Sequence, residues 1–233
     1  GYSIGSEIEY GSLGTKGTLA SGDAFDCDIN GDGTYDSETE RFYYVSDATN
    51  GITTDSNTAV LIYCSNVSSG IASKSTTYAY YEQSNENWHG PVTAIKQLPT
   101  TSQWKTRLTN TKRQITTETN ATSTSGGVLP IDFSYEGYAA RLLTAQEVNT
   151  GCGFTIGYGK FGEISTSCKY MYENTGYTNA NTPNIWYLES PYNSDSINVW
   201  SISSTTRDGN PSDSNILGGV RPAIEVQKSN ISY

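Results

Sequence analysis

The pattern of hydrophobic positions predicts β-strands most clearly in the first third of the chain. Residues 41–46 and 58–64 are short runs of β-branched and aromatic side chains, and turn-forming residues bound both of them. Residues 1–20 place glycines between short alternating patches, which indicates a hairpin or a loose edge strand. After residue 153, short strand-like patches alternate with Gly, Asn and Asp, so we expect several short antiparallel strands there.

One helix is predicted in the middle of the chain. Trp104 and Leu108 are four residues apart within Ser102–Leu108, a spacing that places them on one face of a helix. Thr100 or Thr101 would cap its N-terminus.

A second helix is predicted to begin after Thr144. A threonine at this position and a glutamate at Glu147 fit a capping box, in which each side chain bonds the backbone amide of the other residue. Residues 116–127 are almost wholly Thr, Ser, Asn and Gly and predict a loop. Two helices and many short strands give an α+β fold with twisted antiparallel sheets and long loops. No alternation of strands and helices with a glycine-rich phosphate loop occurs, which argues against a nucleotide-binding fold.

Composition indicates a folded, acidic chain. The 233 residues include 18 Tyr, 12% are aromatic, and the net charge is −10. Aromatic content at this level argues against disorder. The negative charge and the absence of a basic run argue against nucleic acid as a partner. No run of about 18 apolar residues occurs, so the sequence contains no membrane span.

The four cysteines are expected to form disulfides. None lies in a C-x-x-C pair, and His89 is the only histidine, which makes a structural zinc site improbable. Three pairings are open; we favour Cys27–Cys64 and Cys152–Cys168 because each is local in sequence. Disulfides form outside the reducing cytosol. We therefore expect an extracellular or cell-surface location.

The segment 28–36 has the spacing of a calcium loop. Oxygen-bearing groups fall at positions 1, 3, 5, 7 and 9, with a glycine at position 6. They are the side chains of Asp28, Asn30, Asp32 and Asp36 and the carbonyl of Thr34. The segment resembles the D-x-[DN]-x-D-G loop shared by EF-hands, dockerins and thrombospondin-type repeats. We expect one structural Ca²⁺ here.

The loop departs from the EF-hand at position 12, which is Thr39 and not glutamate. Glu38, Glu40 or water would have to close the coordination shell. A solvated acidic turn is the alternative interpretation.

Signals for catalysis are weak. His89 is the obvious general base, yet no G-x-S-x-G nucleophile motif occurs and nothing in the placement of the carboxylates singles out a catalytic pair. We therefore expect no enzymatic activity and interpret His89 as a packed or exposed loop residue.

Three motifs in the last part of the chain carry a family resemblance. They are Tyr138–Val148 (YAARLLTAQEV), Ile185–Pro191 (IWYLESP) and Gly218–Ile224 (GGVRPAI). In this order they resemble the C-type-lectin-like fold, in the branch that includes formylglycine-generating enzymes, the variable proteins of diversity-generating retroelements and many uncharacterised bacterial surface proteins. The resemblance covers about 138–228. From the residues themselves we expect Arg221 to bond a buried carboxylate or carbonyl, and Arg141 and Glu147 to support the same scaffold.

The resemblance implies one domain, 1–233, with strands and the calcium loop in 1–97 and a lectin-like core in 98–233. It places a ligand-contacting face in the segment between the last two motifs. The binding residues expected there are Tyr192, Asn198, Trp200 and Arg207. The enzymatic members act through cysteines near the C-terminus, and no cysteine follows Cys168, so that activity is not carried over.

We therefore expect an adhesin-like binding domain that recognises an extracellular protein or glycan. The alternative is the globular head of a pilin or filament subunit, which would self-assemble and whose membrane anchor would have been removed ahead of Gly1. An ordinary pair of strands joined by loops is the alternative interpretation of segment 192–210.

Overall fold

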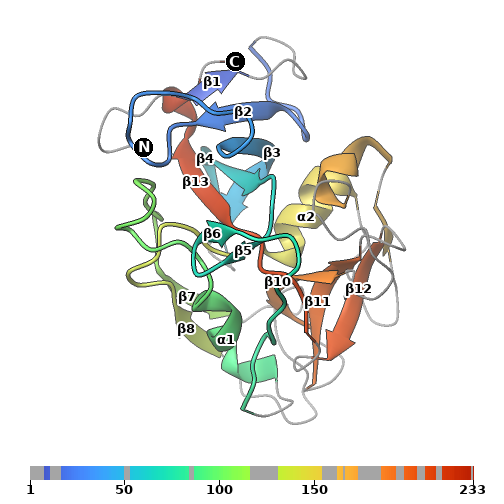
Figure 1. Cartoon of the computed structure of the whole chain (residues 1–233). Coiled ribbons are helices and arrows are strands. Elements are labelled where there is room, and N and C mark those ends of the chain that lie inside the picture. Colours follow the sequence, from blue (N-terminus) through green and yellow to red (C-terminus); the bar gives the residue numbers. More distant parts are fainter. Residues whose placement is uncertain are drawn as a thin grey trace.

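The computed structural model describes residues 8–10, 17–49, 53–83, 87–115, 131–153, 162–164, 166–172, 185–192, 197–203, 208–213, 217–231 and 233. These residues form an α+β fold built from small antiparallel sheets (Figure 1). No helix among them is long and apolar enough to cross a membrane.

The largest sheet has five antiparallel strands in the order β1-β2-β3-β4-β13. Its strands are β1 (Ile8–Tyr10), β2 (Ala24–Cys27), β3 (Arg41–Thr49), β4 (Thr54–Tyr63) and β13 (Ala223–Gln227). The predicted strands 41–46 and 58–64 are confirmed as the main parts of β3 and β4. Because β13 pairs with β4, both ends of the chain contribute to one sheet.

Both faces of this sheet are buried. In β4, Leu61 contributes to one hydrophobic core, while its neighbours Val60 and Ile62 contribute to another core on the opposite face. Successive side chains of a strand point to opposite faces, so a strand covered on both sides needs apolar residues at every position. This explains the uninterrupted run Ala-Val-Leu-Ile-Tyr at the end of β4.

The first core is covered by the middle of the chain. Its elements are β5 (Val67–Ser68), β6 (Ile71–Ala72), η1 (Asn87–His89), α1 (Val92–Ile95), β7 (Lys112–Ile115) and β8 (Ile131–Ser134). In Figure 1, β7, β8 and α1 lie together below the five-stranded sheet.

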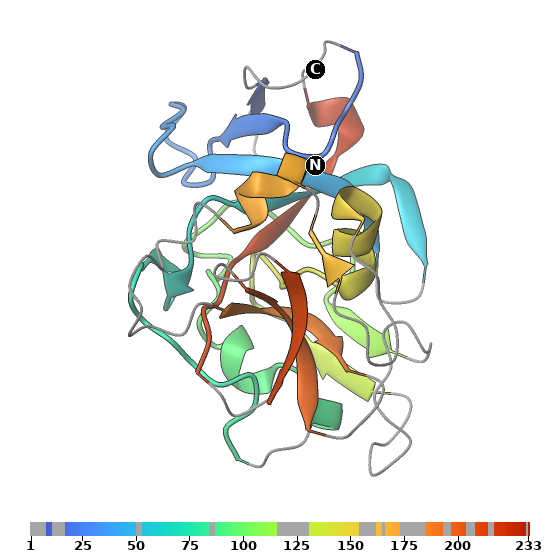
Figure 2. The same cartoon turned by 90° about the vertical axis from the view of Figure 1, so that its right-hand side faces the viewer.

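The second core lies beneath the other face of the sheet. Its elements are α2 (Ala145–Cys152), β9 (Gly162–Glu163), η2 (Thr166–Met171), β10 (Ile185–Pro191), β11 (Asn198–Ser203) and β12 (Asp208–Asp213), and η3 (Lys228–Asn230) follows β13. Strands β10, β11, β12 and β9 form a four-stranded antiparallel sheet, and α2 packs on β3 beside it (Figures 1 and 2).

The predicted capping box of α2 is confirmed. The Thr144 hydroxyl accepts a bond from the Glu147 amide at 3.0 Å, and the Glu147 carboxylate accepts one from the Thr144 amide at 2.9 Å. The helix ends at Gly153, which has the left-handed φ of 70° that suits glycine. The boundaries of this helix are therefore set by its own sequence.

The prediction of a helix over Ser102–Leu108 is wrong. The segment is a turn followed by extended chain, and the short helix α1 lies upstream of it. Tertiary contacts use the groups that a helix would need: the Lys105 amide donates to the Ile29 carbonyl at 2.7 Å, and the Thr106 hydroxyl donates to the Ala139 carbonyl at 2.9 Å. Trp104 is buried in the first core without helical geometry.

The motifs that resemble the lectin-like family pack against one another. Isolated β-bridges join Arg141 to Ala223 and Trp186 to Gly219. Arg221 is buried and donates to the carbonyls of Tyr63, Met171 and Tyr170 at 2.6–3.1 Å, which confirms the expectation of a buried carbonyl partner. Burial lowers the pKa of Arg221 to about 10, so the side chain is still charged at neutral pH.

One of the two expected disulfides is present. Cys152 and Cys168 are bonded and join α2 to η2. Cys27 and Cys64 form no disulfide, so that expectation is wrong. They lie at the ends of β2 and β4, with β3 between them, which separates them by about 10 Å. Cα atoms more than about 7 Å apart cannot be bridged without movement of the backbone.

We predict that peptide mapping by mass spectrometry, under denaturing and non-reducing conditions, will find the Cys152–Cys168 disulfide as the structure has it. A peptide linking Cys152 to Cys168 is expected, together with alkylated Cys27 and Cys64. Replacing Cys152 and Cys168 by alanine should lower the free energy of unfolding by about 2–4 kcal/mol, because the unfolded chain regains the freedom that the bond removes. Cys64→Ala should cost less, since it breaks no covalent bond. A peptide linking Cys27 to Cys64 would contradict this arrangement.

Candidate functional site

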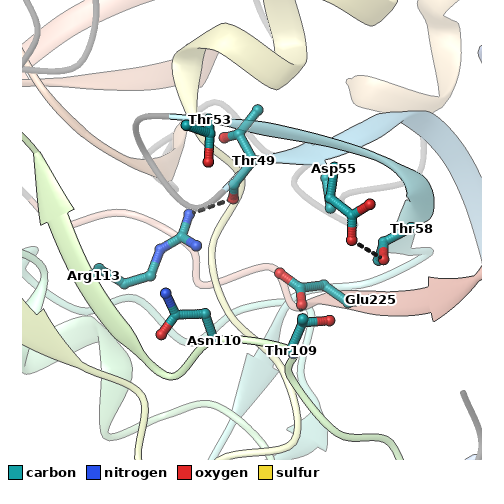
Figure 3. A pocket seen from close by; sticks show the side chains of 9 residues that line it. Thr49, Thr53, Asp55, Thr58, Thr109, Asn110, Arg113 and Glu225 are labelled. Atoms are coloured by element: carbon teal, nitrogen blue, oxygen red, sulfur yellow. Dashed lines mark hydrogen bonds between the residues drawn. The ribbon is translucent and has the colours of Figure 1, made fainter.

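A polar pocket lies where the ends of β3 and β13 meet the start of β4 and the chain leading into β7. Its volume is about 250 Å³, near the small end of ligand pockets. The residues that line it are Ala48, Thr49, Thr53, Asp55, Thr58, Thr109, Asn110, Arg113 and Glu225. Most carry hydroxyl, amide, carboxylate or guanidinium groups, and none is aromatic (Figure 3).

Arg113 forms one wall of the pocket. It is buried, and its guanidinium donates to both carboxylate oxygens of Glu189 at 3.0–3.1 Å and to the Thr49 carbonyl at 2.7 Å. Its Nη1 is buried and has no hydrogen-bond partner among the described residues. Figure 3 shows the guanidinium facing the pocket. An unpartnered buried donor costs about 1–3 kcal/mol, so a ligand acceptor placed here would recover that energy.

Glu225 forms the opposite side. One carboxylate oxygen accepts from Arg141 Nε at 2.7 Å, and the other accepts from the Thr109 amide at 2.7 Å. Burial on its own favours the neutral acid. The ion pair with Arg141 and the Thr109 amide outweigh that effect and lower the pKa of Glu225. Glu225 is therefore a fixed negative charge at neutral pH.

A chain of buried charges connects the two sides. Arg141 also pairs with Glu147, at 2.6 and 2.9 Å. Glu147 accepts from the Thr49 amide at 2.7 Å, and the Thr49 carbonyl is the group that binds Arg113. Three glutamates and two arginines thus surround the end of β3 with a formal charge of −1. The expectation that Arg141 and Glu147 belong to the scaffold is confirmed.

The rim of the pocket adds a half-buried acceptor, Asp55. Asp55 accepts a hydrogen bond from the Thr58 hydroxyl at 2.6 Å and another from the backbone amide of Asn57 at 2.9 Å. These two bonds lower its pKa, so Asp55 is ionised at neutral pH. The pocket therefore offers one buried N–H donor on one side and two carboxylates on the other, together with threonine hydroxyls and the side-chain amide of Asn110.

The residues expected to form the binding face are not in this pocket. Trp200 is 0% exposed and Tyr192 6% exposed, and they stack edge to face in the second core. Placing them on a ligand-contacting surface was therefore wrong, because β11 is covered on the side that carries Trp200. Asn198 is half-buried, and its carbonyl accepts from the Tyr192 amide and the Asn87 side chain. Arg207 lies outside the described residues.

The expected calcium residues lie in the connection between β2 and β3. Asp28 is buried, whereas Asn30, Asp32, Thr34 and Asp36 are exposed. Within the described part of the chain, no three Asp, Glu, His or Cys side chains are arranged as a metal site.

His89 lies in a stack of aromatic rings. Its ring centroid is 3.6 Å from that of Trp88 and 4.4 Å from that of Tyr81. It lies at the end of η1 and does not line the polar pocket. This arrangement agrees with its interpretation as a packed loop residue.

The sequence carried a signal for the pocket that hydrophobic patterning did not use. Glu189 and Glu225 interrupt otherwise apolar strands, in Trp-Tyr-Leu-Glu-Ser and Ala-Ile-Glu-Val. A charge within a buried strand requires a partner of opposite charge. The chain has only 14 Lys and Arg, so few residues could be the partners of these glutamates, and Arg113 and Arg141 were among the candidates that the sequence offered.

We predict that Arg141→Ala lowers the free energy of unfolding by about 3–5 kcal/mol, because Glu147 and Glu225 then remain buried without their cation. The matched control is Arg41→Ala, which removes the partly exposed ion pair with Asp26 and should cost about 1 kcal/mol or less. Urea denaturation measures both values. Equal losses in the two variants would contradict the network as described.

The lowered pKa of Glu225 predicts a pH dependence of stability. The folded protein gains stability from this group above its ordinary pKa of 4.5, and loses that gain as pH falls through the lower folded-state pKa. Denaturation midpoints measured from pH 6 to pH 3 should therefore fall. Glu225→Gln is expected to be less stable at pH 6 and to show a flatter decline. A decline of unchanged steepness in Glu225→Gln would exclude this carboxylate as a contributor.

Comparison with known proteins finds no match to any family model, curated protein or solved structure.

Proposed function

We propose that the chain is a non-enzymatic, adhesin-like binding domain of the bacterial cell surface or of secreted protein, and that its polar pocket binds a hydroxyl-rich group such as one sugar unit of a glycan. The observation that carries this proposal is Arg113 Nη1, a buried donor without a partner among the described residues, in a pocket that the carboxylates of Asp55 and Glu225 line on the opposite side.

The pattern of donors and acceptors favours a neutral polyol over an ion. A hydroxyl group both donates and accepts, so neighbouring hydroxyls can accept from Arg113 and donate to the carboxylates. An anion would meet Asp55 and Glu225, and a simple cation would leave the Arg113 donor unpaired. The volume of about 250 Å³ suits a single small unit.

The rigidity of the pocket supports a binding role. Arg113 is fixed by Glu189 and Thr49, and Glu225 is fixed by Arg141 and Thr109. Groups already held in place lose little side-chain freedom when a ligand binds, so more of the contact energy contributes to affinity.

The same features argue against acid–base catalysis in the pocket. A general acid or base works best with a pKa near the operating pH. The pKa values of Asp55 and Glu225 are both lowered, which keeps both groups ionised and makes them weak bases at neutral pH.

Two further observations support the location and the family. The Cys152–Cys168 bond is typical of an oxidising compartment outside the cytosol. The mutual packing of the three motifs around Arg141, Trp186 and Gly219 supports a C-type-lectin-like arrangement. In this proposal the sugar pocket lies between the five-stranded sheet and β7, and neither Tyr192, Asn198 nor Trp200 lines it.

We predict that a glycan array will identify a ligand and that Asp55→Asn will weaken its binding at least about tenfold, because a charge-assisted hydrogen bond contributes about 1.5–3 kcal/mol. Asn110→Ala should also weaken binding. Titration calorimetry with the free monosaccharide measures both effects.

The matched control is Asn57→Ala, which changes a side chain of β4 that does not line the pocket and should bind like wild type. Glycan binding that is unchanged in Asp55→Asn would contradict the proposed pocket. If the array detects no glycan and the protein assembles into filaments, the filament-subunit interpretation replaces this one.

A further inference from the structure

The connection between β2 and β3, residues 28–40, is held firmly at its base. The Cys27 amide donates to the Glu40 carbonyl at 2.9 Å, and the Lys105 amide donates to the Ile29 carbonyl at 2.7 Å. The Tyr63 hydroxyl donates to the Thr39 carbonyl at 2.8 Å. Both ends of this loop are therefore fixed against the first core.

Asp28 organises the inside of the loop. Its carboxylate is 4% exposed and accepts bonds from the amides of Gly31, Asp32 and Gly33 at 2.7–3.0 Å. Gly31 and Gly33 have φ values of 76° and 83°, a left-handed conformation that glycine adopts without strain. Three amide bonds leave part of the acceptor capacity of the carboxylate unused, since its two oxygens offer about four lone-pair sites.

Glu40 is the last residue of the loop, and one of its two carboxylate oxygens has no hydrogen-bond partner among the described residues. It is 2% exposed; one oxygen accepts from the Asp36 amide at 2.9 Å, and Oε1 is buried with no hydrogen-bond partner. Burial raises the pKa of Glu40; the backbone amides of Asp36 and Asn30 oppose that rise, and the negative charges of Asp28 and Asp32 add to it. A buried carboxylate oxygen that faces two other carboxylates without a countercharge is costly.

No ion pair among the described residues includes Glu40, and the nearest basic side chain shown is that of Lys105, which packs on Gly31. The ion pairs there involve Arg41, Arg113, Arg141 and Lys228, and none includes Asp28, Asp32, Asp36 or Glu40. Five carboxylates therefore belong to one 13-residue loop, two of them buried, and none of the loop's own residues is Lys or Arg.

We propose that this loop binds one Ca²⁺ ion and that Glu40, the thirteenth residue, is the ligand that closes the site. Asp28 and Glu40 supply the buried ligands. Asp32 and Asp36 supply the exposed ones, and Asn30 and the Thr34 carbonyl complete a shell of six oxygens, within the range that Ca²⁺ uses.

Binding requires the exposed side chains to move, because the carboxylates of the described residues are not arranged as a metal site in this structure. Asp32 is bonded to Thr34, and Asp36 to the backbone amide of Glu38. Both aspartates are exposed and would have to turn inward to bind the ion. Glu38 is exposed whereas Glu40 is buried, which favours Glu40 as the closing residue.

A flexible shell with several carboxylates favours Ca²⁺ over Mg²⁺, because Mg²⁺ demands near-ideal octahedral geometry and holds its waters tightly. The ion would neutralise Glu40 and fix the loop on the Trp104–Lys105 segment. Its role is structural and does not depend on the polar pocket.

The test is titration calorimetry with CaCl₂ and MgCl₂, combined with thermal unfolding of the whole chain in Ca²⁺ or EGTA. Wild type should bind one Ca²⁺, and its Tm should rise by roughly 5 °C or more when Ca²⁺ is 100-fold above Kd. Mg²⁺ should give a much smaller shift. If Ca²⁺ produces neither binding heat nor a change in Tm, the loop is only an acidic turn.

Glu40→Gln separates the proposed ligand from the rest of the loop. Removing a buried uncompensated charge should raise Tm in EGTA above that of wild type, while the rise produced by Ca²⁺ should disappear. Glu38→Gln, a change of the same kind two residues away, should keep the wild-type response. Calcium affinity unchanged in Glu40→Gln would exclude Glu40 as a ligand.

Asp32→Asn provides a second variant at an exposed position, where folding is not at risk. It should weaken Ca²⁺ binding by at least about tenfold, because calcium affinity follows the number of charged ligands. Wild-type affinity in this variant would overturn the proposed ligand set.

Discussion

Buried ion pairs fix the position of the end of strand β3. The amide of Thr49 donates to Glu147 and its carbonyl accepts from Arg113, so a single peptide segment lies between two buried ion pairs. Arg141 joins Glu147 to Glu225 on the neighbouring part of the sheet. Helix α2, strand β7 and strand β13 are thereby positioned relative to β3 by polar contacts with fixed geometry, and the pocket is the space that these contacts leave open.

Such a network specifies geometry more than it adds net stability. Removing buried charges from water is expensive, and a well-packed apolar cluster of the same size is often equally stable. A guanidinium group, however, bonds in a fixed plane, whereas apolar side chains tolerate repacking. The network can therefore hold Arg113 Nη1 at a defined place across the pocket from Glu225. Burying five charged residues is costly, and the rigid, pre-organised pocket is what that cost provides.

Local signals in the sequence predicted the elements that depend on local contacts. The capping box at Thr144 and Glu147 positioned α2, and the apolar runs positioned β3 and β4. The class of fold followed from these elements. The helix over Ser102–Leu108 failed because Lys105 and Thr106 use their polar groups on distant parts of the chain, which periodicity does not reveal. The pairing of Cys27 with Cys64 failed because nearness in sequence does not show that another strand lies between them. The pocket was missed for a similar reason: Arg113 and Glu189 are 76 residues apart, and only the tertiary structure brings them together.

The position of β13 has a consequence for biosynthesis. This strand pairs with β4 across 169 residues of sequence, as the bond between Gln227 and Thr58 shows. While the chain emerges from the ribosome, β4 has a partner on the side of β3 and an open edge on the other. That edge is long and apolar, the kind that promotes pairing between chains. A chain cut short before Ala223 would keep this edge open permanently and would also lack Glu225, one of the two carboxylates that Arg141 binds. Truncated products should therefore aggregate, and release of soluble protein should depend on the synthesis of the last few residues.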